Sequence, residues 1–134
     1  HHVVFVQEGG ERRVYVDGEL DDLEIAAKPD GTFRVNDTTI GGILRSSASH
    51  WVTGLIDDVA IWNRALTDEE AAQVHTEGLA SVFPTLGNGL IAYWPLDGNG
   101  QDLSGAGNTL EPMRYWSIAR AAPRPSLMAH TTRD

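Results

Sequence analysis

The chain contains no cysteine, which is the first constraint on what its 134 residues can do. Without thiols it forms no disulfide, no thiolate metal site and no cysteine nucleophile. Long apolar stretches are also missing: none approaches the ~20 residues of a membrane-spanning helix, and no signal-peptide pattern opens the chain. The first six residues, His-His-Val-Val-Phe-Val, instead have the composition of a strand interior. We therefore expect the sequence to be a piece of a longer protein.

Basic residues are scarce, and the formal net charge is −9 at pH 7. Residues 1–110 hold 17 acidic and 6 basic residues, whereas residues 111–134 hold four arginines and two acidic residues. An acidic body argues against nucleic-acid binding, which requires a positive surface for phosphates. It is compatible with calcium or a neutral polysaccharide as ligand, although most surface carboxylates serve only to solvate the protein.

Short segments with strand composition recur along the first half of the chain. The expected strands are residues 1–6, 12–16, 19–26, 33–35, 38–43 and 50–61. Asp17-Gly18 predicts a two-residue hairpin, because glycine tolerates the positive φ of a type I′ turn. Pro29-Asp30-Gly31 predicts a further turn. Strands with turns every ~8–12 residues are typical of an antiparallel β-sandwich or barrel.

Residues 54–70 combine a strand, a polar turn and the start of a helix. Val59 and Ile61 share one strand face at a period of two. Asn63-Arg64 interrupts that pattern. Thr67 is then placed to cap a helix, with Glu70 three residues later, so the two predict a capping box. We expect this helix to span residues 67–75 and to end near Gly78.

The same segment resembles the closing part of laminin-G-like domains in the concanavalin A-like lectin/glucanase superfamily. Those domains close on Gly-Leu-Ile-Asp-Glu-Val, Asn-Arg-Ala-Leu-Ser/Thr and Glu-Glu, which residues 54–70 match closely. The opening His-His-Val strand and the Tyr-Val-Asp-Gly hairpin at residues 15–18 are similar to the same family. Residues 89–97 and 102–108 resemble the family's first strand and its Asp-x-Ser-Gly-x-Gly-Asn loop.

The resemblance implies an all-β fold: an antiparallel jelly-roll β-sandwich, incomplete or permuted, with one short helix. Residues 1–78 would be the C-terminal part of one unit, 79–88 a linker, 89–110 the start of another unit, and 111–134 a tail. The first and last strands of the family lie side by side. We therefore expect residues 90–97 to pair with 55–62 of the same chain, the alternative being a homodimer formed through open sheet edges.

The enzymatic hypothesis rests on Glu19, Asp21 and Glu24. Family 16 glucanases of the same superfamily carry Glu-x-Asp-x-x-Glu on one strand, where a nucleophile and an acid/base flank the sugar bond. Asp22, however, stands where that pattern has an apolar residue, and the motif follows directly on a hairpin. We interpret the match as chance, the carboxylates as a solvated acidic edge, and the protein as not an enzyme.

Calcium is the predicted ion. Asp97, Asp102 and Asn108 surround a loop rich in glycine and serine, whose carbonyl oxygens are hard donors of the kind that calcium prefers. The resemblance places this loop near the closing strand, so Asp58 is a further candidate ligand. The alternative is that these residues only form turns.

Tryptophan supplies the candidate ligand-binding surface. Trp51, beside His50 in an expected loop, is placed to stack on a sugar ring, whereas Trp62 and Trp94 lie in strands and are expected in the core. The predicted function is non-catalytic binding of polysaccharide or glycoprotein, as a module of a secreted, periplasmic or cell-surface protein. A glycoside hydrolase and a structural spacer are the alternatives.

Overall fold

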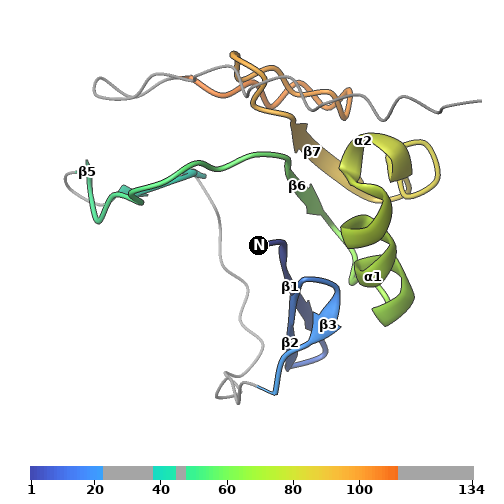
Figure 1. Cartoon of the computed structure of the whole chain (residues 1–134). Coiled ribbons are helices and arrows are strands. Elements are labelled where there is room, and N and C mark those ends of the chain that lie inside the picture. Colours follow the sequence, from blue (N-terminus) through green and yellow to red (C-terminus); the bar gives the residue numbers. More distant parts are fainter. Residues whose placement is uncertain (23–37, 45–47, 112–134) are drawn as a thin grey trace, which may run out of the picture.

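The computed structural model describes residues 1–22, 38–44 and 48–111. Within these ranges the chain forms three small antiparallel sheets and two short helices (Figure 1). The strands are β1 (Val3–Glu8), β2 (Glu11–Val16), β3 (Glu19–Leu20), β4 (Ile43–Leu44), β5 (Ala48–Ser49), β6 (Val59–Trp62) and β7 (Leu90–Trp94); the helices are α1 (Asp68–Glu77) and α2 (Leu79–Val82). The expectation of an antiparallel, mostly β chain is confirmed.

Strands β1, β2 and β3 form a meander joined by two tight turns. The register pairs Val3 with Val16 and Tyr15 with Leu20. In the second turn, Asp17 and Gly18 both have positive φ, 52° and 85°. This is the backbone that a type I′ hairpin needs, so the predicted hairpin is confirmed.

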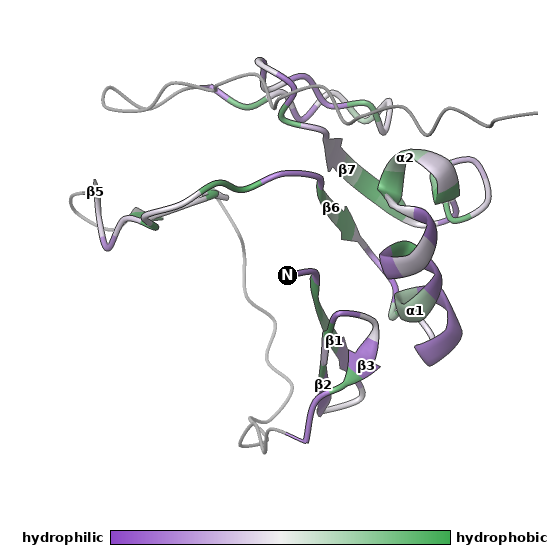
Figure 2. Ribbon diagram, in the orientation of Figure 1, coloured by the Kyte–Doolittle hydropathy of each residue, from purple (hydrophilic) through white to green (hydrophobic). Residues whose placement is uncertain are grey.

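Strand β7 pairs with β6 of the same chain, as the sequence predicted. The register sets Val59 opposite Trp94 and Ile61 opposite Ala92, with an irregularity between Ile61 and Trp62. Two segments about 30 residues apart in sequence therefore share one sheet. Figure 2 shows β6 and the shaft of β7 mostly in the green of hydrophobic residues.

Helix α1 begins as expected, with a capping box at its N-terminus. The N–H of Glu70 donates to the Thr67 hydroxyl, and the Glu70 carboxylate accepts from the Thr67 N–H. Asp68, Glu69 and Glu70 place negative charge at the positive end of the helix dipole. The helix ends at Gly78, whose φ of 78° favours glycine.

The expectation of one helix is corrected, because α2 follows directly after Gly78. The proline and glycines of residues 79–88 predict a linker. In the structure this segment begins with α2, and its Leu79, Val82 and Leu86 are buried. Their spacing of three and four residues puts them on one side of a helical turn, and that apolar spacing was the missed signal.

Two strand predictions in the middle of the chain are wrong. Residues 40–42 form a bend rather than a strand, and the strand expected from residue 50 begins at Val59. His50, Gly54 and Asp58 have φ values of 54°, 156° and 51°. Such residues interrupt an extended strand. The predicted strand 33–35 and residues 23–26 of the predicted strand 19–26 lie outside the described residues.

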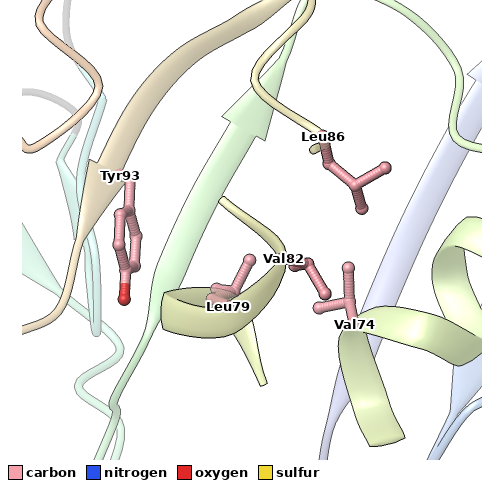
Figure 3. Close-up of a cluster of buried hydrophobic side chains, with 5 residues drawn as sticks. All are labelled: Val74, Leu79, Val82, Leu86 and Tyr93. Carbon is pink, nitrogen blue, oxygen red and sulfur yellow. The ribbon is translucent and has the colours of Figure 1, made fainter. Parts of the chain in front are cut away.

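The core consists of two clusters that α1 connects. One contains Val6, Tyr15, Leu66 and Ala71; the other contains Val74, Leu79, Val82, Leu86 and Tyr93 (Figure 3). Ala71 and Val74 are three residues apart on the same helix, so α1 packs against the β1–β2 sheet and against the β6–β7 sheet. Within the described ranges, neither helix is long and apolar enough to cross a membrane.

Candidate functional site

The predicted ligand-binding residues lie on a projection that we call the arm, residues 38–44 and 48–58. The arm extends away from the helices and carries the β4–β5 pair (Figure 1). Trp51 is 44% exposed and Leu55 is 96% exposed, with Val52 also exposed. None of these three side chains belongs to either of the two buried clusters.

Trp51 is held against the backbone of Gly42. A Cβ at Gly42 would lie 2.7 Å from the indole ring, so glycine is what allows the ring to lie there. Two hydrogen bonds fix the surrounding loop: the Val52 N–H donates to the Gly41 carbonyl over 2.9 Å, and the Thr39 hydroxyl donates to the Gly42 carbonyl over 2.7 Å. The ring is therefore supported from one side while much of it faces solvent.

His50, the other predicted binding residue, is exposed beside Trp51. Its Nδ1 lies 2.9 Å from the Ser49 hydroxyl. Its φ of 54° is unusual for a residue with a side chain, and such backbone conformations concentrate at turns and functional sites. The two predicted binding residues, which are neighbours in sequence, are thus both exposed on the arm.

The loop after β7 is organised by the carboxylate of Asp102. One oxygen, Oδ1, accepts from the N–H groups of Tyr93 and Ser104, each over 2.9 Å, and Oδ2 accepts from the N–H of Asn108 over 2.8 Å. Burial raises the pKa of Asp102, but these hydrogen bonds outweigh it and bring the pKa down to about 2. The carboxylate therefore stays charged at neutral pH despite being buried.

Three of the four predicted calcium ligands, Asp102, Asn108 and Asp58, form hydrogen bonds within the chain. Asp102 uses both oxygens for backbone donors, and the Asn108 amide donates to the Ile91 carbonyl. Asp97 is exposed, and Asp58 accepts from the Tyr93 hydroxyl over 3.1 Å. In the part of the chain that the structure describes, no three His, Asp or Glu side chains gather as a metal site would need. The donor set fits a hydrogen-bonded loop better than a calcium site, and calcium binding stays a prediction.

Two of the three candidate catalytic carboxylates, Glu19 and Asp21, lie near the outer edge of the first sheet. Glu19 is exposed on β3, and Asp21 follows it with its N–H donating to the Val14 carbonyl. Glu24 lies outside the described residues. The exposed position of Glu19 is what a solvated edge strand would show.

Several polar contacts that tie the elements together were not anticipated from the sequence. The Tyr15 hydroxyl donates to Asp68 Oδ1 over 2.6 Å, which joins β2 to the start of α1. Arg64 forms a two-pronged contact with Glu70, at 2.6 and 2.8 Å, and also donates to the Asn88 carbonyl. The pKa of Glu70 is lowered, first by its hydrogen bond to Arg64. These partners are far apart in sequence or in different elements, so no local pattern marks them.

Comparison with known proteins settles the family. A laminin-G-type family model, described as concanavalin A-like lectin/glucanases superfamily, matches residues 1–72, more than half of the chain. The chain belongs to the concanavalin A-like lectin/glucanase superfamily. No curated protein and no solved structure matches it.

Membership of the superfamily confirms the resemblance found in residues 1–70. The antiparallel sheets agree with the superfamily's β-sandwich, of which this chain shows a small and partial form. The match ends before β7, so the likeness of residues 89–110 to a family opening stays a prediction. The superfamily's description spans both sugar-binding lectins and glucanases, and function must therefore be argued from the site.

Proposed function

We propose that this chain is a non-catalytic recognition module that binds carbohydrate through Trp51. The observation that carries the proposal is the exposed indole ring, supported on Gly42 of the arm. A sugar ring presents a face of C–H groups that packs favourably on an aromatic face. Because hydrogen bonds already hold the loop, little conformational entropy is lost when the ligand binds.

His50 supplies the polar part of the same surface. Its imidazole is exposed beside Trp51 and offers a ring nitrogen to a sugar hydroxyl. An apolar platform flanked by a polar group is a common arrangement in small-molecule sites, where polar groups fix orientation and apolar surface supplies affinity. A shallow, exposed platform of this kind suits a polysaccharide or glycoprotein glycan better than an enclosed small molecule.

Recognition of such ligands fits a secreted, periplasmic or cell-surface protein, which is the location we propose. Superfamily membership supports this location, since laminin-G-like domains are typically extracellular. Binding is preferred to hydrolysis because Glu19 is exposed on an edge strand, without the burial that tunes a catalytic acid.

Affinity electrophoresis in gels that contain soluble polysaccharides tests the proposal. The wild-type chain should be retarded by at least one β-glucan, mannan or galactan, and Trp51→Ala should lose at least about tenfold in affinity, the effect of removing ~1.4 kcal/mol of contact. Leu55→Ala is the matched control, because Leu55 is still more exposed on the same arm but aliphatic. Retardation of both variants equal to the wild type would refute the role of Trp51.

Two further outcomes of this experiment distinguish the alternatives. If no polysaccharide or glycoprotein retards the wild-type chain, the module is better described as a spacer. If reducing sugar is released from a β-glucan and Glu19→Gln abolishes the release, the chain is a hydrolase and the proposal is wrong.

A further inference from the structure

A cavity of about 850 Å³ lies between β1 and β6. It is lined by two unbroken runs, residues 1–7 and 56–66, together with Val74 and Leu79. Side chains of a strand alternate between its two faces, so a cavity over one face meets every second residue. Unbroken runs on both sides therefore mean that the cavity faces the edges of the two strands. We call this cavity the slot.

The register identifies which backbone groups of β1 point into the slot. The Asp17 N–H donates to the His2 carbonyl, so alternate residues of β1, Val4 and Val6, turn their backbone groups toward β2. Val3, Phe5 and Gln7 then turn their N–H and C=O groups the other way. In the described part of the chain, β1 pairs with β2 alone, so these groups face the slot.

The same reasoning applies to β6. The N–H and C=O of Tyr93 bond to Asp102 and Leu103, on the side of β7 away from β6. The neighbours of Tyr93 on β7 therefore bond to Val59 and Ile61. Ala60 lies between these two and turns its N–H and C=O toward the slot. Both sides of the slot thus offer backbone donors and acceptors.

The two edges run in the same direction. At one end, Val6 of β1 packs with Leu66 just after β6, beside the start of α1. At the other end, His2 lies against His75 near the end of α1, with ring centroids 5.6 Å apart. Figure 1 shows the same parallel course. Because β1 and β6 run in the same direction, a strand bound between them can be antiparallel to both. The strand pairs that the structure describes are antiparallel as well.

The floor and the charge of the slot define the chemistry of its occupant. Leu66, Val74 and Leu79 line the slot from the helix side, so inward-facing side chains should be apolar. The chain carries a net charge of −9, and residues 1–110, which include both sides of the slot, hold 17 acidic and 6 basic residues. Electrostatic complementarity therefore favours basic residues on the occupant.

We propose that the slot binds one extended peptide strand of a partner protein, in which apolar residues alternate with basic ones. The bound strand would complete a single sheet in the order β3-β2-β1-partner-β6-β7. Main-chain hydrogen bonds to Phe5 and Ala60 would supply affinity, and the apolar floor would supply specificity, as in other cases of strand addition. This protein-binding role is separate from carbohydrate binding on the arm.

Selection from a phage-displayed library of random nine-residue peptides tests the proposal. Phe5→Pro is the blocking variant, since proline removes the N–H that points into the slot and leaves the bonds from Val4 and Val6 to β2 intact. Phe5→Ser is the matched control, because it keeps that N–H. Enriched peptides should alternate apolar and basic residues and should bind Phe5→Pro at least about tenfold more weakly than Phe5→Ser.

A second proline variant, on the β6 edge, keeps the test valid if Phe5→Pro fails to fold. Ala60→Pro should also weaken peptide binding. Circular dichroism checks that this variant is folded, and affinity electrophoresis checks that it still binds polysaccharide through the arm. In the wild-type chain, bound peptide should slow amide hydrogen exchange at Phe5 and Ala60. The proposal is overturned if no peptides are enriched, if they bind both proline variants as tightly as the wild type, or if the wild-type chain fills the slot by dimerising with itself.

Discussion

The body of the molecule, formed by β1, β2, β6, β7 and the two helices, and the arm differ in what their side chains do. In the body, Tyr15 is 1% exposed and its hydroxyl still has a partner in Asp68. On the arm, Trp51 and Leu55 face solvent. The buried side chains that stabilise the fold therefore belong to the body, and the arm carries exposed apolar surface. If the arm binds carbohydrate, as we propose, one short chain separates stability and binding in space.

The sharpest test of this division removes equivalent side chains from the two regions. Leu86→Ala should lower the free energy of unfolding by about 2–5 kcal/mol, because it opens a cavity among buried residues. Leu55→Ala should change it by less than ~0.5 kcal/mol. Urea unfolding followed by circular dichroism measures both values. Similar losses for the two variants would mean that the arm is part of the core.

A second test concerns the loop that Asp102 organises. Asp102→Asn keeps the size of the side chain but turns an N–H₂ group toward a backbone N–H donor, and it should destabilise the body by about 1–3 kcal/mol at neutral pH. The pKa of Asp102 is lowered from 3.8 to about 2. The stabilisation that the Asp102 carboxylate gives the folded chain is therefore complete above pH 3.8 and is lost as the pH falls toward 2.

Asp97→Asn is the matched control for this loop: Asp97 is exposed, so the substitution should change the free energy of unfolding little. Both variants should be melted with calcium and with chelator. If the Asp102 carboxylate only accepts backbone hydrogen bonds, Asp102→Asn should lower the melting temperature equally with calcium and with chelator. A calcium-dependent rise in the wild-type melting temperature that disappears in Asp102→Asn would instead establish the predicted calcium site.

The strands and turns of the body were predictable because their signals are local. An apolar run from Val3 to Val6 marks β1, and the alternating Val14 and Val16 mark β2. Asp17-Gly18 marks the hairpin, and Thr67 with Glu70 marks the helix start. The arm was predicted poorly for the opposite reason. Its residues have strand composition, but left-handed backbone at His50 and Asp58 interrupts them, and no residue type there announces that geometry.

The exposure of the candidate binding residues could be predicted, whereas the hydrogen-bond partners of the loop after β7 could not. Trp51 was chosen because it lies beside His50 in an expected loop, and both residues are exposed. Asp102 was chosen for its oxygens, but which groups use those oxygens depends on the fold of residues 93–108 around it. The slot leaves no mark in the sequence, because it arises from two strand edges more than 50 residues apart.

A third test compares two arginines of the body. Arg64→Lys loses the two-pronged contact with Glu70 and the bond to Asn88, and should lower the free energy of unfolding by about 1 kcal/mol. Arg13→Lys should change it by less than half of that, because the Arg13 contacts to Glu8 and Asp68 are 3.6 and 3.4 Å long. Chemical unfolding at 0.1 M salt measures both. A larger loss for Arg13 would place the main ionic link of α1 at β2 instead.

The smallest expected effect is a pH dependence at the joint between β1 and α1. The pKa of His2 is lowered, first by burial and then by His75, while Asp17 acts in the opposite direction. As the pH falls below 6.5, the unfolded chain takes up the proton before the folded chain does, so stability decreases. His75→Gln removes one of the causes that lower the pKa of His2 and should reduce the drop in melting temperature between pH 7.5 and 5.5. His50→Gln, which alters an exposed histidine of the arm, should leave that drop unchanged. If His50→Gln has the larger effect, the arm rather than the body senses protons in this range.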